Sequence, residues 1–449
     1  MRKGITRVQF FMLSFFLFSM FLGAGNIIFA PPLGQAAGTH TWIAMSGFLI
    51  TGVGLVLAAI YALSIAGEKI DLLAGRVDKR FAVFYSVLLF LCLGPLFVIP
   101  RTAAVVFEVS VNPLLPDSLK QSFWSLLLFS LFFIGSTIYL SLEPSKFVAR
   151  IGRIITPTFI ILLGIIVIKS LATPIGAFGE PTGDYVEHAF GRGFTQGYNT
   201  MDVLAAFVFG KIFLDAARLA GVQSEKMPSF FIKAGLFTMI ALALVQISLA
   251  AMGASSVSAI GISKNGGEAL PQIVYLLLGQ TGVIMLACVV FLTGWTTAIA
   301  CLASVAEYFS RQFPQFNYRG WVIIFGLISL LITNFGLNTI LTMALPGLYF
   351  LYPVSITLMI LIFLNRFFDG RQAVYVGAVA AAGLMRVLDG LKSVNLLPAA
   401  ADAFLSAYIP FYSSGMGWIM LAVSGGIIGW CYFKLTGQGS RRFENSPVS

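Results

Sequence analysis

The residues with the clearest potential for chemistry are Gly23-Ala24-Gly25-Asn26, set in an apolar run without Asp, Glu, Lys or Arg over residues 8–67. Glycine lacks a Cβ and asparagine competes with the helix through its own side chain, so a helix is expected to break here. A break in hydrocarbon leaves peptide groups unpaired, and each is costly unless protein, ion or ligand satisfies it. The stretch is therefore either a binding site or a notch for a neighbouring helix.

The remainder of the chain is that of a protein that crosses a membrane many times. Hydrophobic residues make up 58% of it, charged residues 10%, and the mean hydropathy is +0.92. Because a span takes about 20 apolar residues, the charge-free runs predict an all-α polytopic membrane protein with about twelve transmembrane helices. The predicted spans are residues 8–36, 41–66, 81–107, 121–142, 154–171, 197–217, 229–252, 280–309, 320–335, 339–364, 372–391 and 414–434.

Basic residues give the chain a net charge of +10, but they alternate by loop instead of forming one patch. This positive-inside pattern predicts that both termini are cytoplasmic. The basic excess therefore indicates topology and contact with anionic membrane lipid, and no nucleic-acid partner. The four cysteines are single and without metal spacing, so neither disulfides nor a metal cluster is expected.

The third predicted span contains Gly94-Pro95, which should kink it, followed by Arg101 and Glu108. These two charges lie seven residues apart and share a helix face if the helix continues. A snorkelling pair near the surface is the favoured interpretation, and a gating pair is the alternative.

A second interruption is predicted in the sixth span, near residues 207–210, where Lys211 follows. Transporters built from inverted repeats carry paired helix interruptions that frame the substrate at the midplane. If the first five spans form one repeat, the sixth span is the counterpart of the first. The chain would then divide into a first repeat over residues 1–171, a second over 172–365, and two peripheral helices with a cytoplasmic tail over 366–449.

Three hydroxyls, Thr293, Thr296 and Thr297, fall within the eighth predicted span. Threonine in a membrane helix usually bonds back to a carbonyl one turn earlier. Adjacent hydroxyls are also hard oxygen ligands, and with free carbonyls from the broken first helix they could coordinate a small cation such as sodium. Both interpretations stay open at this stage.

Several motifs follow one another along the chain. They are Gly23-Ala24-Gly25-Asn26-Ile27-Ile28-Phe29-Ala30-Pro31-Pro32, then Gly94-Pro95-Leu96-Phe97, Pro100-Arg101-Thr102-Ala103 and Phe107-Glu108-Val109, then Gly197-Tyr198-Asn199-Thr200-Met201-Asp202, Tyr352-Pro353 and Leu388-Asp389-Gly390. In this order they closely resemble the bacterial branched-chain amino acid carrier family, the BrnQ-type cation-coupled carriers of leucine, isoleucine and valine. The match extends over essentially the whole chain.

The resemblance implies a LeuT-like fold, with ten core helices in two inverted repeats and two peripheral helices, in the bacterial cytoplasmic (inner) membrane. It implies sodium symport by alternating access, without catalysis and with sodium as the coupling ion in place of a cofactor. It places the substrate carboxylate on Gly23, Ala24, Gly25 and Asn26, and the ammonium and an aromatic wall at Phe207, Phe209 and Gly210. It assigns sodium to the carbonyls of Ser19 and Leu22 and the hydroxyls of Thr296 and Thr297. Lys211 departs from the family's pattern.

Other functions leave different signatures. A proton-coupled carrier of the same fold is the nearest alternative, with Lys169 or Lys211 as the titrating group. An intramembrane enzyme would need clustered acids, histidines or a nucleophile beside a base, and the few ionisable residues in the spans do not group in that way. A channel would show a repeated filter sequence or a ring of charges, which the sequence does not contain.

Overall fold

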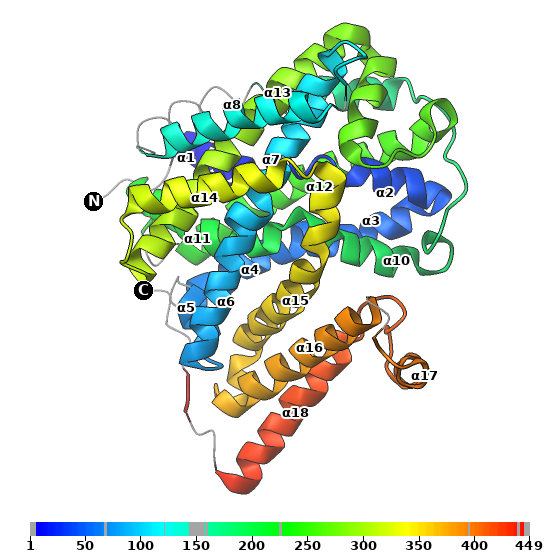
Figure 1. The fold of residues 1–449 in the computed structure, drawn as a ribbon. Helices are drawn as coiled ribbons and strands as arrows, with labels where there is room; N and C mark the ends of the chain where they lie inside the picture. Colours follow the sequence, from blue (N-terminus) through cyan, green and yellow to red (C-terminus); the bar gives the residue numbers. More distant parts are fainter. Residues whose placement is uncertain are drawn as a thin grey trace.

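The computed structural model describes residues 6–66, 70–120, 122–142, 158, 160–223, 227–393, 396–437 and 441–443. The first residues of the fifth predicted span, 154–157, lie outside the described residues. Within the described part the chain is helical, and eight helices are long and apolar enough to cross a membrane. Shorter apolar helices over Gln9–Phe21, Ile160–Ala172 and Tyr318–Thr333 complete the set (Figure 1).

The first span is interrupted, as predicted. Helix α1 (Arg7–Phe21) ends and α2 (Ala30–Ala37) begins on either side of residues 22–29, which we call the first break. The chain turns at Gly38, whose φ of +49° is available to glycine at little cost. The next elements are α3 (Thr41–Leu49), the π-helical η2 (Ile50–Gly54), α4 (Leu55–Ala66), α5 (Ile70–Ala74), α6 (Lys79–Leu91), α7 (Val98–Val106) and α8 (Phe123–Ser141).

The third span is kinked where the sequence predicts. A π-helical turn, η3 (Cys92–Leu96), separates α6 from α7, and Gly94 inside it has non-helical angles (φ −107°, ψ −113°). Pro95 has no N–H to donate and its ring clashes with the preceding turn, which explains the kink. The kink redirects α7, the helix that carries Arg101.

The second half contains a break at a different place from the one predicted. Helix α10 (Tyr185–Gln196) and the 3-10 turn η6 (Gly197–Thr200) precede α11 (Asp202–Leu219), which is continuous through residues 207–210. The prediction of an interruption at residues 207–210 is therefore wrong, because a single glycine did not outweigh the helical propensity around it. The interruption lies at residues 197–201, which we call the second break.

The remaining helices are α12 (Met227–Ile260), α13 (Gly266–Gln312), α14 (Tyr318–Thr333), α15 (Leu337–Leu364), α16 (Gln372–Ser393), α17 (Ala399–Tyr408) and α18 (Trp418–Thr436). Helix α13 bends at Gly279, where φ is +65°. Glycines let several of these backbones approach closely. A Cβ on Gly34 of α2 would lie 1.9 Å from the carbonyl oxygen of Ala250 on α12, and one on Gly266 would lie 1.8 Å from that of Ile28. Helices α12 and α13 therefore hold the first break in place.

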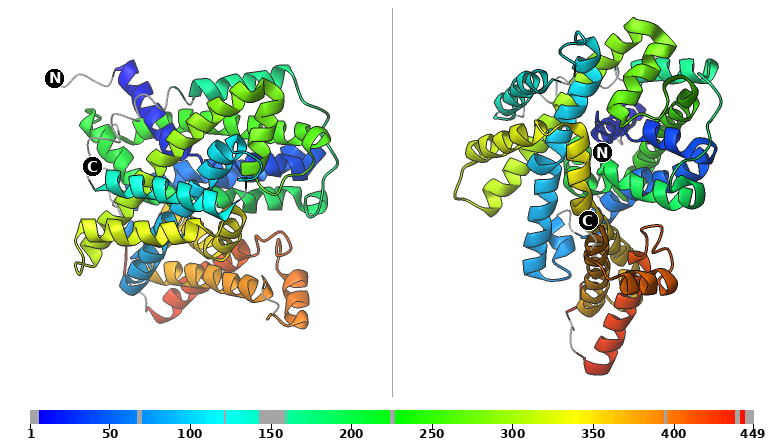
Figure 2. Two further views of the ribbon diagram at one scale, coloured as in Figure 1. Left: turned by 45° about the horizontal axis from the view of Figure 1, so that its top comes forward. Right: turned by 45° about the vertical axis from the view of Figure 1, so that its right-hand side comes forward.

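The last two spans form a pair at one end of the molecule. Figures 1 and 2 show α16 and α18 side by side, reached through α15 and set apart from the other helices. Their contact runs through glycines, since a Cβ on Gly377 would lie 2.2 Å from the carbonyl oxygen of Gly425. These are the two peripheral helices of the predicted fold.

The glycine contact between α16 and α18 gives a stability prediction. A Cβ on Gly425 would meet the Gly377 carbonyl oxygen at 2.3 Å, whereas one on the adjacent Gly426 would meet nothing closer than 3.6 Å. We expect Gly425→Ala to lower the free energy of unfolding by about 1–3 kcal/mol through overpacking, and Gly426→Ala to leave it nearly unchanged. Tryptophan fluorescence during denaturation in mixed micelles measures both. Equal stability of the two variants would contradict the close contact.

Candidate functional site

The first break leaves backbone groups without partners inside the helical bundle. Asn26 N–H donates to the carbonyl of Gly23 at 3.0 Å, and Phe29 N–H to that of Asn26 at 3.4 Å. Among the hydrogen bonds of the described residues, none outside the helices starts from N–H of Gly23, Ala24 or Gly25, and none ends on the carbonyls of Ser19 or Leu22. The break therefore leaves donors at residues 23–25 and acceptors at residues 19 and 22 available to a ligand.

The second break owes its shape to a residue that is not glycine. Met201 has φ +61° and ψ 12°, a left-handed conformation that costs about 1–2 kcal/mol for a residue with a Cβ. Tyr198 is fully buried and stacks on Tyr352 at 4.5 Å between ring centroids. Contacts of this kind hold the turn in place, so that α11 begins at Asp202.

A buried hydrogen bond joins the two breaks. The side-chain nitrogen of Asn26 lies 2.8 Å from both carboxylate oxygens of Asp202, and it also donates to the carbonyl of Phe21. The two side chains are only 4% and 5% exposed. One amide thus ties the end of α1 and the first break to the start of α11, 176 residues further along the chain.

The kinked third span brings a positive charge to the same place. Arg101 of α7 is 4% exposed, and its Nη1 donates to the carbonyl of Asn199 in the second break. Its guanidinium lies 5.3 Å from the centroid of the Phe29 ring, and Nη2 is 3.0 Å from where a Cβ would stand on Gly25. Arg101 therefore contacts both breaks, and the absence of a side chain at Gly25 is what admits it.

The snorkelling interpretation of Arg101 is consequently wrong. The side chain does not reach a surface, and Glu108 accepts instead from Asn112 on its own span at 3.1 Å. A spacing of seven residues places Arg101 and Glu108 on one face only if the α-helix is regular. A π-helical turn, η4 (Phe107–Val111), begins before Glu108, so this condition is not met.

The hydroxyls on α13 adopt the ordinary geometry and also approach the first break. Thr296 and Thr297 both donate to the carbonyl of Thr293 at 2.9 Å. Thr297 Oγ1 lies 3.2 Å from where a Cβ would stand on Gly23. A hydroxyl that donates its hydrogen keeps its lone pairs, so the back-bonding and a ligand role are compatible.

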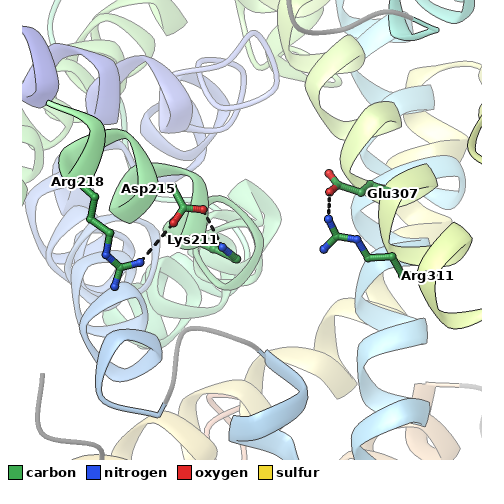
Figure 3. Close-up of polar contacts among 5 residues, drawn as sticks. All are labelled: Lys211, Asp215, Arg218, Glu307 and Arg311. Atoms are coloured by element: carbon green, nitrogen blue, oxygen red, sulfur yellow. Dashed lines mark hydrogen bonds and ion pairs between the residues drawn. The ribbon is translucent and has the colours of Figure 1, made fainter. Parts of the chain in front are cut away.

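Lys211 belongs to a different environment. Its amine lies 2.7 Å from Asp215, which also pairs with Arg218 at 3.3 Å, and these side chains are between 41% and 46% exposed. Figure 3 shows this group on α11 and a separate Glu307–Arg311 pair on α13. Lys211 is thus one member of an exposed ion-pair group, which accounts for a lysine at this position.

Phe207, Phe209 and Gly210 lie in the first half of α11 and are buried. A Cβ on Gly210 would stand 3.0 Å from Ile60, so this residue faces α4. Because their peptide groups are part of a continuous helix, their carbonyls are not freed by a break. Their contact with substrate stays a prediction, as do the roles assigned to the first-break residues and to Ser19, Leu22, Thr296 and Thr297.

Asp202 was absent from the predicted site, and Arg101 was placed at the wrong depth. A signal for both was present. Asp202 is the one charge in residues 193–210, and Arg101 follows twenty residues, 81–100, without any. An ionisable residue inside a span is by default functional, and that rule would have found them.

The apolar helices of the described residues, with two helix breaks joined by a buried hydrogen bond, define the chain as an all-α polytopic membrane protein with the LeuT-like fold. A profile of the branched-chain amino acid transport protein family matches residues 6–436. The chain belongs to this family, so it is a transporter and not an enzyme.

Relatives with functional names cover nearly the whole chain. It is 40% identical to the branched-chain amino acid permease BraB of Bacillus subtilis (strain 168), over 97% of both chains. It is 35% identical to the permease BrnQ of the same bacterium, over 96% of this chain and 98% of that one, and 34% identical to BrnQ of Escherichia coli (strain K12), over 92% of each.

Solved structures show the same fold at low sequence identity. Mhp1, a nucleobase-cation-symport-1 family transporter in a closed conformation, matches with a TM-score of 0.61 at 15% identity, over 95% of this chain and 92% of that one. MhsT in complex with L-phenylalanine matches with a TM-score of 0.55 at 16% identity, over 94% and 98%.

The bond between the breaks gives a second prediction. Removing Asn26 takes a side-chain donor from both oxygens of the buried Asp202 carboxylate, so Asn26→Ala and Asp202→Ala should each destabilise the fold. The double variant should be more stable than the sum of the two losses predicts, by about 1–3 kcal/mol, because contacting residues couple. Unfolding in mixed micelles measures the cycle. Additive losses would show that the two side chains do not interact.

Proposed function

We propose that the chain imports leucine, isoleucine and valine together with sodium, by alternating access at the two breaks. The observation that carries the proposal is the Asn26–Asp202 bond, which places both breaks at one polar cluster in the bundle. The relatives named as branched-chain amino acid permeases support the substrate class. The domains proposed for this function are the two repeats, residues 1–171 and 172–365, with residues 366–449 outside them.

A zwitterion needs donors at one end and acceptors at the other, which opposed half-helix ends supply. The unpaired N–H groups of Gly23, Ala24 and Gly25 suit the carboxylate. Phe29, Phe207 and Phe209 are buried near the start of the two half-helices and suit a branched aliphatic side chain. An apolar pocket separates substrates by only about 1–3 kcal/mol per methylene, so selectivity within the three should be loose.

Sodium is proposed at the other side of the first break. The Ser19 and Leu22 carbonyls and the Thr297 hydroxyl are oxygen ligands of the kind a hard cation requires, and Thr297 lies beside Gly23. A cation there would tie α1 to α13. Such an ion favours whichever conformation it binds more tightly, and this difference in affinity sets the limit of coupling.

The membrane orientation is part of the proposal. We place the chain in the bacterial cytoplasmic membrane with both termini inside, because basic residues mark the expected ends of several helices. Examples are Lys79 and Arg80 at the start of α6, Arg218 and Arg311 at the ends of α11 and α13, and Lys434 in the last turn of α18.

Proton coupling is the second candidate, and the observation that favours it is the buried carboxylate of Asp202. Purified protein in liposomes separates the two. We expect an inward sodium gradient to drive accumulation of labelled leucine at constant pH, and a pH gradient without sodium to drive none. Accumulation driven by pH alone would establish the proton carrier instead, and the absence of leucine uptake under both gradients would refute the proposed function.

The sodium site can be tested at one hydroxyl. Thr297→Val keeps the shape of the side chain but removes an oxygen ligand, so we expect the apparent sodium affinity for leucine uptake to fall about tenfold, or 1.4 kcal/mol. Thr293→Val is the matched control, because Thr293 makes the same kind of bond one turn earlier on α13, to the carbonyls of Val289 and Val290, but is not one of the proposed sodium ligands. Unchanged sodium dependence in Thr297→Val would remove this residue from the site.

A further inference from the structure

The carboxylate of Asp202 is buried in the bundle but bonds to a neutral amide and not to a positive charge. Its carboxylate oxygens accept from Asn26, while the nearby Thr200 hydroxyl accepts from the Asp202 N–H at 3.3 Å and donates to the carbonyl of Gly197 at 2.9 Å. An ionised carboxylate has more acceptor positions than one amide N–H can fill. A buried charge of this kind is costly unless it is paired.

Arg101 shows the complementary deficit. Nη1 donates to the Asn199 carbonyl, while Nε is buried and makes no hydrogen bond with any described residue. Nη2, beside Gly25, makes none either among the described residues. A guanidinium presents its N–H groups as a fork that fits a carboxylate on two atoms. Here most of that fork is unused although the side chain is 4% exposed.

The two opposite charges are not joined directly. Arg101 bonds Asn199, three residues before Asp202 at the start of α11, yet no ion pair within 4.0 Å connects the two charges in the part of the chain described. Their partners are neutral instead, because Asp202 accepts from the Asn26 amide and Arg101 donates to the Asn199 carbonyl. Arg101 and Asp202 thus form a separated pair of opposite charges. Arg101 has unused N–H donors, and the Asp202 carboxylate has unused acceptor positions.

We propose that Arg101 and Asp202 bind the two charged ends of the transported amino acid, the guanidinium taking the α-carboxylate and the Asp202 carboxylate taking the α-ammonium. This deepens the proposed function and rests on it. The free backbone N–H groups of the first break would bind the same α-carboxylate as Arg101, because Nη2 lies beside Gly25. The carbonyls of residues 207–210 remain inside a continuous helix. The Asp202 carboxylate takes their place as the acceptor for the α-ammonium.

Charge balance supports the assignment. A zwitterion adds one charge of each sign, so the cluster stays neutral overall whether it is filled or empty. A ligand that lacks its ammonium or its carboxylate would leave Asp202 or Arg101 without its partner, and an unpaired buried charge is strongly penalised. The pair therefore selects zwitterions against both amines and carboxylic acids of the same shape.

The test uses ligands that lack one end each. Leucine, leucinol (no carboxylate) and 4-methylpentanoate (no ammonium) are compared by the thermal stabilisation they give to the purified full chain in sodium buffer. We expect the wild type to bind leucine at least a hundredfold more tightly than either analogue. In Asp202→Asn the preference for leucine over 4-methylpentanoate should fall at least tenfold, and in Arg101→Gln the preference over leucinol should fall likewise.

The matched control is Glu108→Gln, on the same span as Arg101 but bonded to Asn112, which should leave both preferences unchanged. Asp202→Glu and Arg101→Lys preserve the charges and should restore part of each preference if the Asn or Gln variant is unstable. Both preferences unchanged in Asp202→Asn and Arg101→Gln, with leucine still bound, would overturn this inference and leave the proposed function standing. No leucine binding by folded wild type would refute the proposed function, and this inference with it.

Discussion

The constraint on which this structure depends is that a peptide group in hydrocarbon must find a partner. The first and second breaks interrupt the backbone hydrogen bonding of two spans, and the Asn26–Asp202 bond brings these breaks together. Neighbouring side chains satisfy part of the backbone groups that the breaks leave unpaired. Asn26 bonds the carbonyl of Phe21 with the same nitrogen that it presents to Asp202. Arg101 takes the Asn199 carbonyl of the second break. The backbone N–H groups and carbonyls that remain unpaired are ones that a small polar ligand could bind. The contacts that stabilise the breaks therefore also determine which donors and acceptors are available to a ligand.

The helices around the breaks have distinct tasks. Helix α12 packs closely on α2 at Gly34, and Gly266 at the start of α13 contacts Ile28 of the first break. These two contacts fix where the break lies. Helix α7 is redirected by the Gly94 kink and carries Arg101 to the centre. Helices α16 and α18 make their own glycine contact (Figures 1 and 2). Arg386 of α16 reaches towards the second break, since its guanidinium lies 5.9 Å from the Tyr349 ring, which contacts Tyr198.

Local composition was enough to predict apolar helices at most of the expected positions, the Gly94–Pro95 kink and the first break, because glycine, proline and asparagine act on the backbone where they stand. The second break was misplaced for the same reason. Met201 is left-handed through its surroundings, with Tyr198 stacked on Tyr352, and a methionine gives no local sign of that. Arg101 was misjudged because its partner, Asn199, is 98 residues away in the chain. Contacts of such separation are not encoded in spacing.

The central claim is that an amino acid lies between the two breaks, and an experimental structure of the purified chain with leucine and sodium tests it most directly. The account predicts leucine between residues 23–26 and 199–202, its ammonium within hydrogen-bond distance, about 3 Å, of Asp202 and its carboxylate at the first break and Arg101. Leucine bound elsewhere in the bundle, with the Asn26–Asp202 cluster unaltered and unoccupied, would contradict it.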